Sequence, residues 1–196
     1  MATLHFVIGG ARSGKSAFAE GLALEKAGAN PITYAATAEI FDDEMAERVA
    51  LHQQRRGPNW HLVEAPVNLA GAIASADTPN SVLLIDCLSV WVTNLLVKDM
   101  DIDVASANLL AALQQASGTI VLVASETGLG IVPDNRLSRR FRDANGRLNQ
   151  ALAADADAVI FVGVGINAQT TGRGQRKPSA ATGGRRRRTP ALSTGD

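Results

Sequence analysis

The sequence predicts an α/β fold in which helices cover both faces of a mostly parallel sheet. Three observations predict this class. Short apolar runs alternate with longer helix-like stretches along the chain. The short runs are apolar throughout rather than at every second residue, which is typical of parallel strands buried on both faces. Finally, Gly9-Gly10-Ala11-Arg12-Ser13-Gly14-Lys15-Ser16 matches the phosphate-binding pattern G-x-x-x-x-G-K-[ST] between a strand-like run and a helix-like run.

The first half of the chain shows this alternation clearly. A strand is expected at residues 4–8, directly before the phosphate loop, and a helix at residues 16–24, directly after it. A second strand is expected at residues 31–36. Residues 42–56 predict a helix, because acidic residues at its start suit the positive helix end and Gly57-Pro58 ends it.

The remaining elements continue the pattern. Strands are expected at residues 60–64, 81–86, 119–124 and 158–162, and helices at 68–76, 88–96, 104–116 and 137–154. Ligands of such sheets bind at the carboxyl ends of the strands. The candidate site therefore consists of residues that directly follow strands: 9–16, 37–39, Glu64, Asp86 and 125–130.

Composition divides the chain into two parts. Residues 1–165 are expected to form one nucleotide-binding catalytic domain, and residues 166–196, rich in Gly, Thr, Ser, Pro and Arg, a disordered basic tail. The net charge of zero hides an asymmetry, because the tail holds seven basic residues and one acid, which leaves 12 basic and 18 acidic residues in the body. We therefore expect no nucleic-acid partner for the body; only the tail could attract a polyanion.

The sequence also predicts a cytoplasmic protein. No apolar run approaches the roughly 20 residues that a membrane span needs, so no span is expected. No basic-then-apolar secretory leader precedes the first predicted strand. The single cysteine, Cys87, excludes an internal disulfide and suits a reducing compartment.

The phosphate loop predicts nucleoside triphosphate substrates, GTP or ATP, with Mg²⁺ as cofactor. Its glycines let backbone N–H groups turn toward the phosphates, and the following helix start adds positive charge. Lys15 is expected to contact the β- and γ-phosphates and to stabilise charge on the transferring group, and Ser16 to ligate Mg²⁺. Asp86 ends an apolar strand, where a Walker-B acid would hold the same ion.

Two further groups carry possible chemistry. Glu44, Arg48 and His52 are spaced to share one helix face, and an imidazole there is either a nucleophile or an ordinary surface residue. Glu126 lies in a glycine-rich segment after a strand, either as an acid, base or metal ligand or in a plain connection. Several arginines near these groups either bind phosphates or form a solvated surface: Arg55, Arg56, Arg136, Arg139, Arg140 and Arg142.

Taken in order, these motifs resemble the bifunctional adenosylcobinamide kinase / adenosylcobinamide-phosphate guanylyltransferase family of cobalamin biosynthesis. The resemblance covers roughly residues 4–162. It rests on residues 9–16, 34–39, 42–45 with Arg48 and His52, 86–88 with Trp91, Thr93 and Asn94, 126–133, 139–143 and 146–150. It implies a RecA-like P-loop NTPase fold, with adenosylcobinamide and its phosphate as partners.

The resemblance further implies two reactions and their residues. A nucleoside triphosphate phosphorylates adenosylcobinamide; GMP then moves from GTP to that phosphate through a guanylylated histidine, giving adenosylcobinamide-GDP and pyrophosphate. The matching histidine is His52. The implied nucleotide contacts are Gly9–Ser16, Thr37, Ala38, Glu39, Gln53, Gln54, Arg55, Arg56, Glu64 and Asp86. The resemblance also implies a homo-oligomer, in the form of a trimer.

Other functions remain to be separated from this one. A small-metabolite kinase shares the phosphate loop but needs no histidine at position 52. A regulatory GTPase is disfavoured because the guanine-reading N-K-x-D stretch is absent from the sequence. The run Arg185 to Arg188 would bind nucleic acid only through the tail. The tail itself departs from the family pattern, as a natural extension or as the product of a shifted reading frame.

Overall fold

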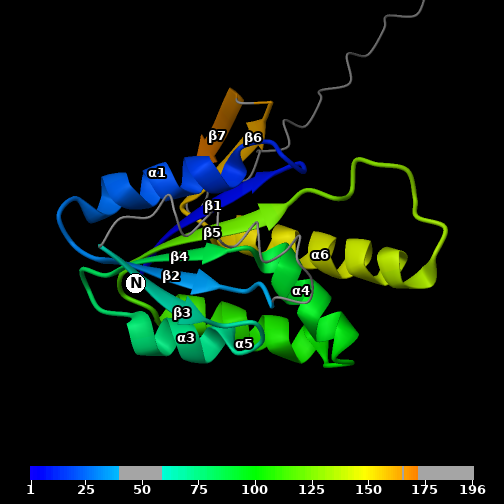
Figure 1. Cartoon of the computed structure of the whole chain (residues 1–196), viewed down its shortest axis with the longest axis horizontal. Helices are drawn as coiled ribbons and strands as arrows, with labels where there is room; N and C mark the ends of the chain where they lie inside the picture. The colour runs from blue at the N-terminus through cyan, green and yellow to red at the C-terminus, as the bar shows by residue number, and fades with distance from the viewer. Residues whose placement is uncertain (40–58, 165, 172–196) are drawn as a thin grey trace, which may run out of the picture.

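A seven-stranded sheet runs through the computed structural model, which describes residues 1–39, 59–164 and 166–171 (Figure 1). The strands are β1 (Thr3–Gly9), β2 (Ile32–Ala36), β3 (Trp60–Glu64), β4 (Val82–Asp86), β5 (Thr119–Ser125), β6 (Ala158–Gly163) and β7 (Ile166–Thr171). Their order across the sheet is β3-β2-β4-β5-β1-β6-β7. All neighbours are parallel except the last pair, β6 and β7.

Helices cover both faces of this sheet. Helix α1 (Lys15–Ala27) packs its alanines on one face, which includes Val7, Leu84 and Val123. The other face carries α3 (Leu69–Ala76), α4 (Leu88–Val97), α5 (Ile102–Gln115) and α6 (Arg136–Asp155). In Figure 1, α1 lies above the sheet and α3 and α5 lie below it. This is the predicted α/β class, with a mostly parallel sheet between two helical layers.

The central strands β4 and β5 are buried except at their ends, as their continuous apolar sequence predicts. Residues 121–124 of β5 and residues 84–85 of β4 have no exposed surface. Such strands cannot present a polar face to water, so they require a helix on each side. Trp91 of α4 is also buried, and its ring N–H donates to the carbonyl oxygen of Val67 at 2.7 Å, which ties α4 to the start of α3.

Three helices begin at side chains that accept a first-turn N–H. Asn68 accepts from Gly71 N at 3.0 Å, Asp101 from Val104 N at 3.0 Å, and Asn135 from Ser138 N at 2.7 Å. These caps fix the starts of α3, α5 and α6 within two residues of the predicted positions. None of the helices in the described parts of the chain is long and apolar enough to cross a membrane.

Strand β7 corrects the predicted domain boundary. Residues 166–171 were assigned to a disordered tail, but they pair antiparallel with β6, with Gly163 opposite Ile166. The assignment was wrong for residues 166–171. An edge strand is hydrogen-bonded on one side only and needs few buried side chains. The side chains of residues 166–170 are accordingly exposed, so no apolar pattern marks the strand. The rest of the predicted tail, residues 172–196, and the predicted helix at 42–56 lie outside the described residues.

Candidate functional site

The carboxyl ends of the parallel strands lie together at one end of the sheet, which we call the site edge. Most of the predicted site residues lie there. Ala36 of β2 pairs with both Glu64 of β3 and Asp86 of β4, so three strand ends lie level. Gly9 of β1 pairs with Ser125 of β5. The phosphate loop, residues 37–39, Glu64, Asp86 and the β5–α6 connection therefore all leave the sheet at this edge, as predicted.

The phosphate loop has a backbone that only its glycines allow. A side chain at Gly9 would collide with the carbonyl oxygen of Val162. Gly14 has φ 92°, in the left-handed region that favours glycine. Helix α1 begins directly after Gly14 and has no side-chain cap, so its first N–H groups are open to an anion. The Lys15 ammonium folds back over the loop and donates to the carbonyl oxygen of Gly10 at 3.1 Å.

One buried hydroxyl in this loop lacks a partner among the described residues. Ser13 is 9% exposed, and its Oγ makes no hydrogen bond there. A buried hydroxyl without a partner costs about 1–3 kcal/mol, so such a group is unusual in the absence of a ligand. Its position inside a glycine-rich turn suits an oxyanion such as a phosphate.

Ser16 and Asp86 are the predicted magnesium ligands. Ser16 lies in the first turn of α1, and Asp86 ends β4, with β5 between β4 and the strand of the phosphate loop. One hydroxyl and one carboxylate form a donor set that suits Mg²⁺, which combines few protein oxygens with water and substrate phosphates. The residues present therefore fit the predicted ion.

The side chain of Thr37 is turned into the protein interior at the end of β2. Its side chain is fully buried, and its hydroxyl accepts from Cys87 N at 2.9 Å and donates to Cys87 O at 2.8 Å. The Tyr34 hydroxyl also reaches this turn, at 3.4 Å from the carbonyl oxygen of Asp86. Thr37 stays a predicted nucleotide contact, and in the structure its side chain clamps the segment that carries Asp86.

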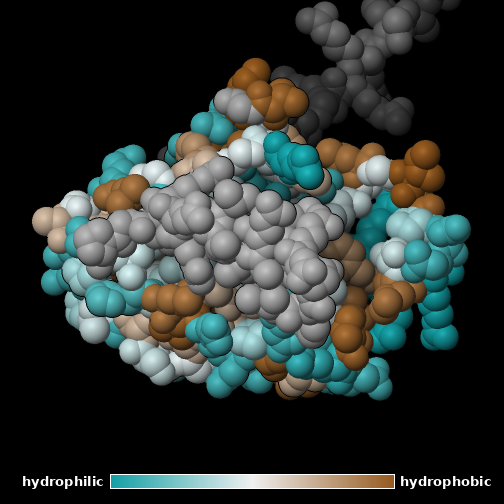
Figure 2. Space-filling model, in the orientation of Figure 1, coloured by the Kyte–Doolittle hydropathy of each residue, from teal (hydrophilic) through white to brown (hydrophobic). Residues whose placement is uncertain are grey.

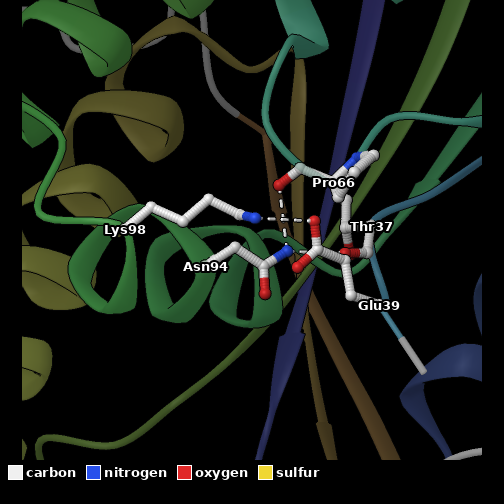
Figure 3. A network of polar contacts seen from close by, with 5 residues as sticks. All are labelled: Thr37, Glu39, Pro66, Asn94 and Lys98. Carbon is white, nitrogen blue, oxygen red and sulfur yellow. Dashed lines mark hydrogen bonds and ion pairs between the residues drawn. The ribbon is translucent and has the colours of Figure 1, made fainter. Parts of the chain in front are cut away.

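A second group of contacts joins α4 to the ends of β2 and β3 (Figure 3). The buried amide of Asn94 donates to the carbonyl oxygens of Thr37, at 2.7 Å, and Pro66, at 2.9 Å. One turn further along, the Lys98 ammonium lies 3.1 Å from a carboxylate oxygen of Glu39. Helix α4 thus supports both segments that follow these strands.

The β5–α6 connection is held from two helices. Ser89 of α4 accepts from Ser125 N at 2.8 Å and donates to Asn145 of α6 at 2.9 Å; the Asn145 amide donates to the carbonyl oxygen of Ser125 at 2.9 Å. Glu126 N donates to the carbonyl oxygen of Gly9 at 3.0 Å, next to the phosphate loop. The Glu126 carboxylate accepts from the backbone of its own connection, at Gly128 N and Leu129 N.

Several predicted site residues lie apart from this centre. Glu64 is exposed at the end of β3, four strands from β1, or about 19 Å at the usual strand spacing. A nucleotide that contacts both Glu64 and the phosphate loop after β1 must therefore extend across the ends of the strands between them. Arg136, Arg139 and Arg140 are exposed, as a solvated surface would be. Five predicted residues lie outside the described parts of the chain: His52, Gln53, Gln54, Arg55 and Arg56.

Sequence reasoning did not assign the roles of Ser89, Asn94 and Asn145. All three are polar and buried, and each bonds to a segment at least 20 residues away. A signal was present, because Ser89 and Asn94, with Thr93, are the polar residues of a mostly apolar helix. Buried polar side chains almost always have hydrogen-bond partners, but the sequence does not identify those partners.

The Cys87 thiol is kept protonated at this edge. Burial raises the pKa of Cys87 to about 11, and the negative charge of Asp86 acts in the same direction. A thiol is nucleophilic only as the thiolate. Cys87 is therefore a packing residue beside the candidate metal ligand rather than a nucleophile.

Comparison with known proteins places this geometry in context. Residues 5–170 match the family model described as cobinamide kinase / cobinamide phosphate guanyltransferase. The chain is 44% identical over 162 residues to the bifunctional adenosylcobalamin biosynthesis protein CobP of Pseudomonas aeruginosa, covering 82% of this chain and 92% of that protein. It is 43% identical over 175 residues to the bifunctional adenosylcobalamin biosynthesis protein CobU of Escherichia coli, covering 82% and 95%. The family match includes most of β7, beyond the expected end of the resemblance at residue 162.

Two similar chains among solved structures have low sequence identity and TM-scores below 0.5. A KaiC-like protein from the hyperthermophilic archaeon Pyrococcus horikoshii is 14% identical with a TM-score of 0.43, covering 81% of this chain and 70% of that chain. The flagellar accessory protein FlaH from Methanocaldococcus jannaschii is 12% identical with a TM-score of 0.45, covering 86% and 77%. These likenesses concern the fold alone.

Proposed function

The chain belongs to the cobinamide kinase / cobinamide phosphate guanyltransferase family, and from this premise we propose that it catalyses both reactions on adenosylcobinamide. The first transfers the γ-phosphoryl group of a nucleoside triphosphate to the aminopropanol hydroxyl. The second transfers GMP from GTP to the new phosphate, giving adenosylcobinamide-GDP and pyrophosphate. The family match over residues 5–170, which includes an intact phosphate loop, carries this proposal.

In the kinase step the chain binds the triphosphate and leaves its terminal phosphorus open to attack. The loop N–H groups, Ser13 and Lys15 hold the phosphates, and the acceptor hydroxyl oxygen forms a bond to the γ-phosphorus. The bond from that phosphorus to the β,γ-bridging oxygen breaks, the nucleoside diphosphate leaves, and the hydroxyl proton passes to solvent. Mg²⁺ bound by Ser16 and Asp86 would neutralise phosphate charge during this transfer.

In the guanylyl transfer step we assign the nucleophile to His52. A ring nitrogen of His52 bonds to the α-phosphorus of GTP, and the bond to the α,β-bridging oxygen breaks, which releases pyrophosphate. An oxygen of the acceptor phosphate then attacks the same phosphorus. The phosphorus–nitrogen bond breaks, a new P–O–P link forms, and His52 returns to its free state. The position of His52 in the family motif supports this assignment.

The nucleotide contacts proposed for both steps follow the site edge. The phosphates contact residues 9–16, and the rest of the nucleotide extends toward Ala38, Glu39 and Glu64. Residues 53–56 complete the contacts on the segment after His52. Thr37 belongs to the same set of proposed contacts, and its hydroxyl, which is bonded to Cys87, also supports Asp86.

We further propose that the enzyme works in the cytoplasm as a homotrimer. Exposed apolar side chains on the β5–α6 connection support self-association: Leu129 is 84% exposed and Ile131 is 96% exposed. This connection stands out from the body at the right of Figure 1, and the same margin is partly brown in Figure 2. Sedimentation equilibrium of the wild type should give three times the 20.5 kDa chain mass, and a monomer would contradict the proposed assembly.

One assay tests the proposed function as a whole. The full-length protein is incubated with adenosylcobinamide, GTP and Mg²⁺, and the corrinoid products are separated over time. We expect adenosylcobinamide phosphate first and adenosylcobinamide-GDP afterwards, with pyrophosphate released in step with the second product. Accumulation of the phosphate without any GDP derivative would reduce the protein to a kinase.

A further inference from the structure

Helix α6 presents a line of polar side chains to the β5–α6 connection. Arg142, Asn145 and Asn149 are spaced three and four residues apart, so they share one helix face. Each donates to a backbone carbonyl at the end of β5 or in the connection after it: Asn145 and Asn149 to Ser125 at 2.9 and 3.2 Å, and Arg142 to Gly128 at 3.2 Å. The guanidinium of Arg142 is thereby held against the connection rather than extended into solvent.

This connection lies beside the phosphate loop. Strand β5 lies between β4, which ends in Asp86, and β1, which ends in the loop. The bond from Glu126 N to the carbonyl oxygen of Gly9 fixes the start of the connection against the start of the loop. Helix α6 packs on the face of the sheet opposite α1, so the positive charge of Arg142 lies at the site edge on that face.

One of the two terminal nitrogens of the Arg142 guanidinium lacks a hydrogen-bond partner in the described parts of the chain. One terminal nitrogen, Nη2, donates to Gly128, but the other, Nη1, is buried and has no hydrogen-bond acceptor among those residues. A buried charged donor without an acceptor is strongly unfavourable, and natural structures leave few of them. A guanidinium is well matched to oxyanions, which it binds through two parallel N–H groups.

We propose that Arg142 binds the phosphate monoester of the acceptor during guanylyl transfer. This inference rests on the proposed function and names a residue for its second substrate. The triphosphate already has Lys15, Ser13 and the α1 start as partners, and α1 packs on the opposite face of the sheet from α6. In the acceptor step the leaving group is the His52 nitrogen, so an acceptor oxygen in line with it approaches the phosphorus from the side that pyrophosphate has left, beside the phosphate loop. Arg142 would fix the acceptor phosphate there and would discriminate it from the unphosphorylated acceptor.

The test uses Arg142→Gln and Arg142→Lys in the full-length enzyme, with Arg140→Gln as control. Arg140 is exposed and lies on a different face of α6. We expect Arg142→Gln to raise the KM for adenosylcobinamide phosphate by about 10- to 150-fold, the usual worth of a charged hydrogen bond. Arg142→Lys should recover part of this loss, and Arg140→Gln should match the wild type. Covalent labelling by GTP without acceptor should be unchanged in all variants.

Two outcomes of these kinetics would overturn the proposal. Equal rises in KM for the phosphorylated and unphosphorylated acceptors would assign Arg142 a purely structural role at the connection. Slower self-labelling by GTP in Arg142→Gln would instead assign its partner to a nucleotide phosphate. Either pattern excludes a role confined to the acceptor monoester.

A binding measurement separates this inference from the proposed function. Aminopropanol phosphate is titrated by calorimetry into wild type and Arg142→Gln with the nucleotide site filled by GDP. We expect at least 10-fold weaker binding in the variant. If the variant binds this phosphate more weakly but the wild type shows no guanylyl transfer, the proposed function is refuted and the assignment of Arg142 as a phosphate monoester ligand stands. Equal affinities, or no binding to the wild type, would overturn the assignment even in an enzyme that catalyses both reactions.

Discussion

The side chain of Thr37 and the backbone of Cys87 are joined by two hydrogen bonds, of 2.8 and 2.9 Å, between the ends of β2 and β4. The residue before Cys87 is Asp86, the candidate magnesium ligand. A buried hydroxyl that both donates and accepts fixes the relative position of the two strand ends. The direction in which the chain leaves the sheet after Asp86 therefore depends on the residue that follows another strand, β2.

Replacing Thr37 tests this clamp. Thr37→Val keeps the shape of the side chain but removes the acceptor of Cys87 N, so we expect the free energy of unfolding to fall by about 1–3 kcal/mol. Thr37→Ser keeps the hydroxyl and should lose less. Urea unfolding of the three proteins measures the difference. A valine variant as stable as the serine variant would contradict the role of the hydroxyl.

The two contacts of α4 in Figure 3 should differ in strength. Asn94→Leu removes the donors to the carbonyl oxygens of Thr37, in a buried bond, and of Pro66, in a partly buried one, which should cost about 2 kcal/mol or more of unfolding free energy. Lys98→Met breaks a partly exposed ion pair with Glu39, which should cost less than about 1 kcal/mol. Thermal and urea unfolding rank the two variants, and the reverse order would refute this interpretation of the network.

Cys87 should resist alkylation in the folded protein. With a pKa of about 11, roughly one thiol in ten thousand is ionised at pH 7. Because the folded pKa lies above the unfolded one, the contribution of Cys87 to stability is complete below about pH 8.5 and is lost as pH rises through 11. Iodoacetamide labelling followed by mass spectrometry checks this, with protein in urea as the reactive control. Labelling at equal rates in both samples would contradict a partly buried, protonated thiol.

Lys15 should matter to both reactions without supporting the fold. Its ammonium bonds to the carbonyl oxygen of Gly10, within the same loop, and so ties no distant segments together. We expect Lys15→Ala to lower both activities by on the order of 100-fold, since it removes charge stabilisation from one shared triphosphate site. Lys26→Ala, at the other end of α1, is the matched control. An unaffected guanylyl transfer in Lys15→Ala would mean that the two reactions use separate nucleotide sites.

The sequence predicts the fold well where local chemistry determines it. Continuous apolar runs identified β4 and β5, and the glycine–lysine–serine pattern located the loop between β1 and α1. Strand β7 was missed because an exposed edge strand has no apolar signature, and its pairing depends on β6.

The site was predictable only in part, for a related reason. Strand-end residues such as Asp86 follow from the parallel sheet, but the use of Thr37 as a clamp depends on Cys87, 50 positions away. The unsatisfied nitrogen of Arg142 likewise becomes visible only once α6 lies against the β5–α6 connection. Periodicity gives the face of a helix but not the group that this face meets.

The central claim is that the second reaction passes through a guanylylated His52. Its most direct measurement is covalent labelling by GTP carrying an α-phosphorus label, in wild type, His52→Ala and His61→Ala. His61 is exposed on β3 and serves as the matched control. We predict an acid-labile adduct in wild type and His61→Ala, and none in His52→Ala, which should retain its kinase activity. Full labelling of His52→Ala would contradict the account.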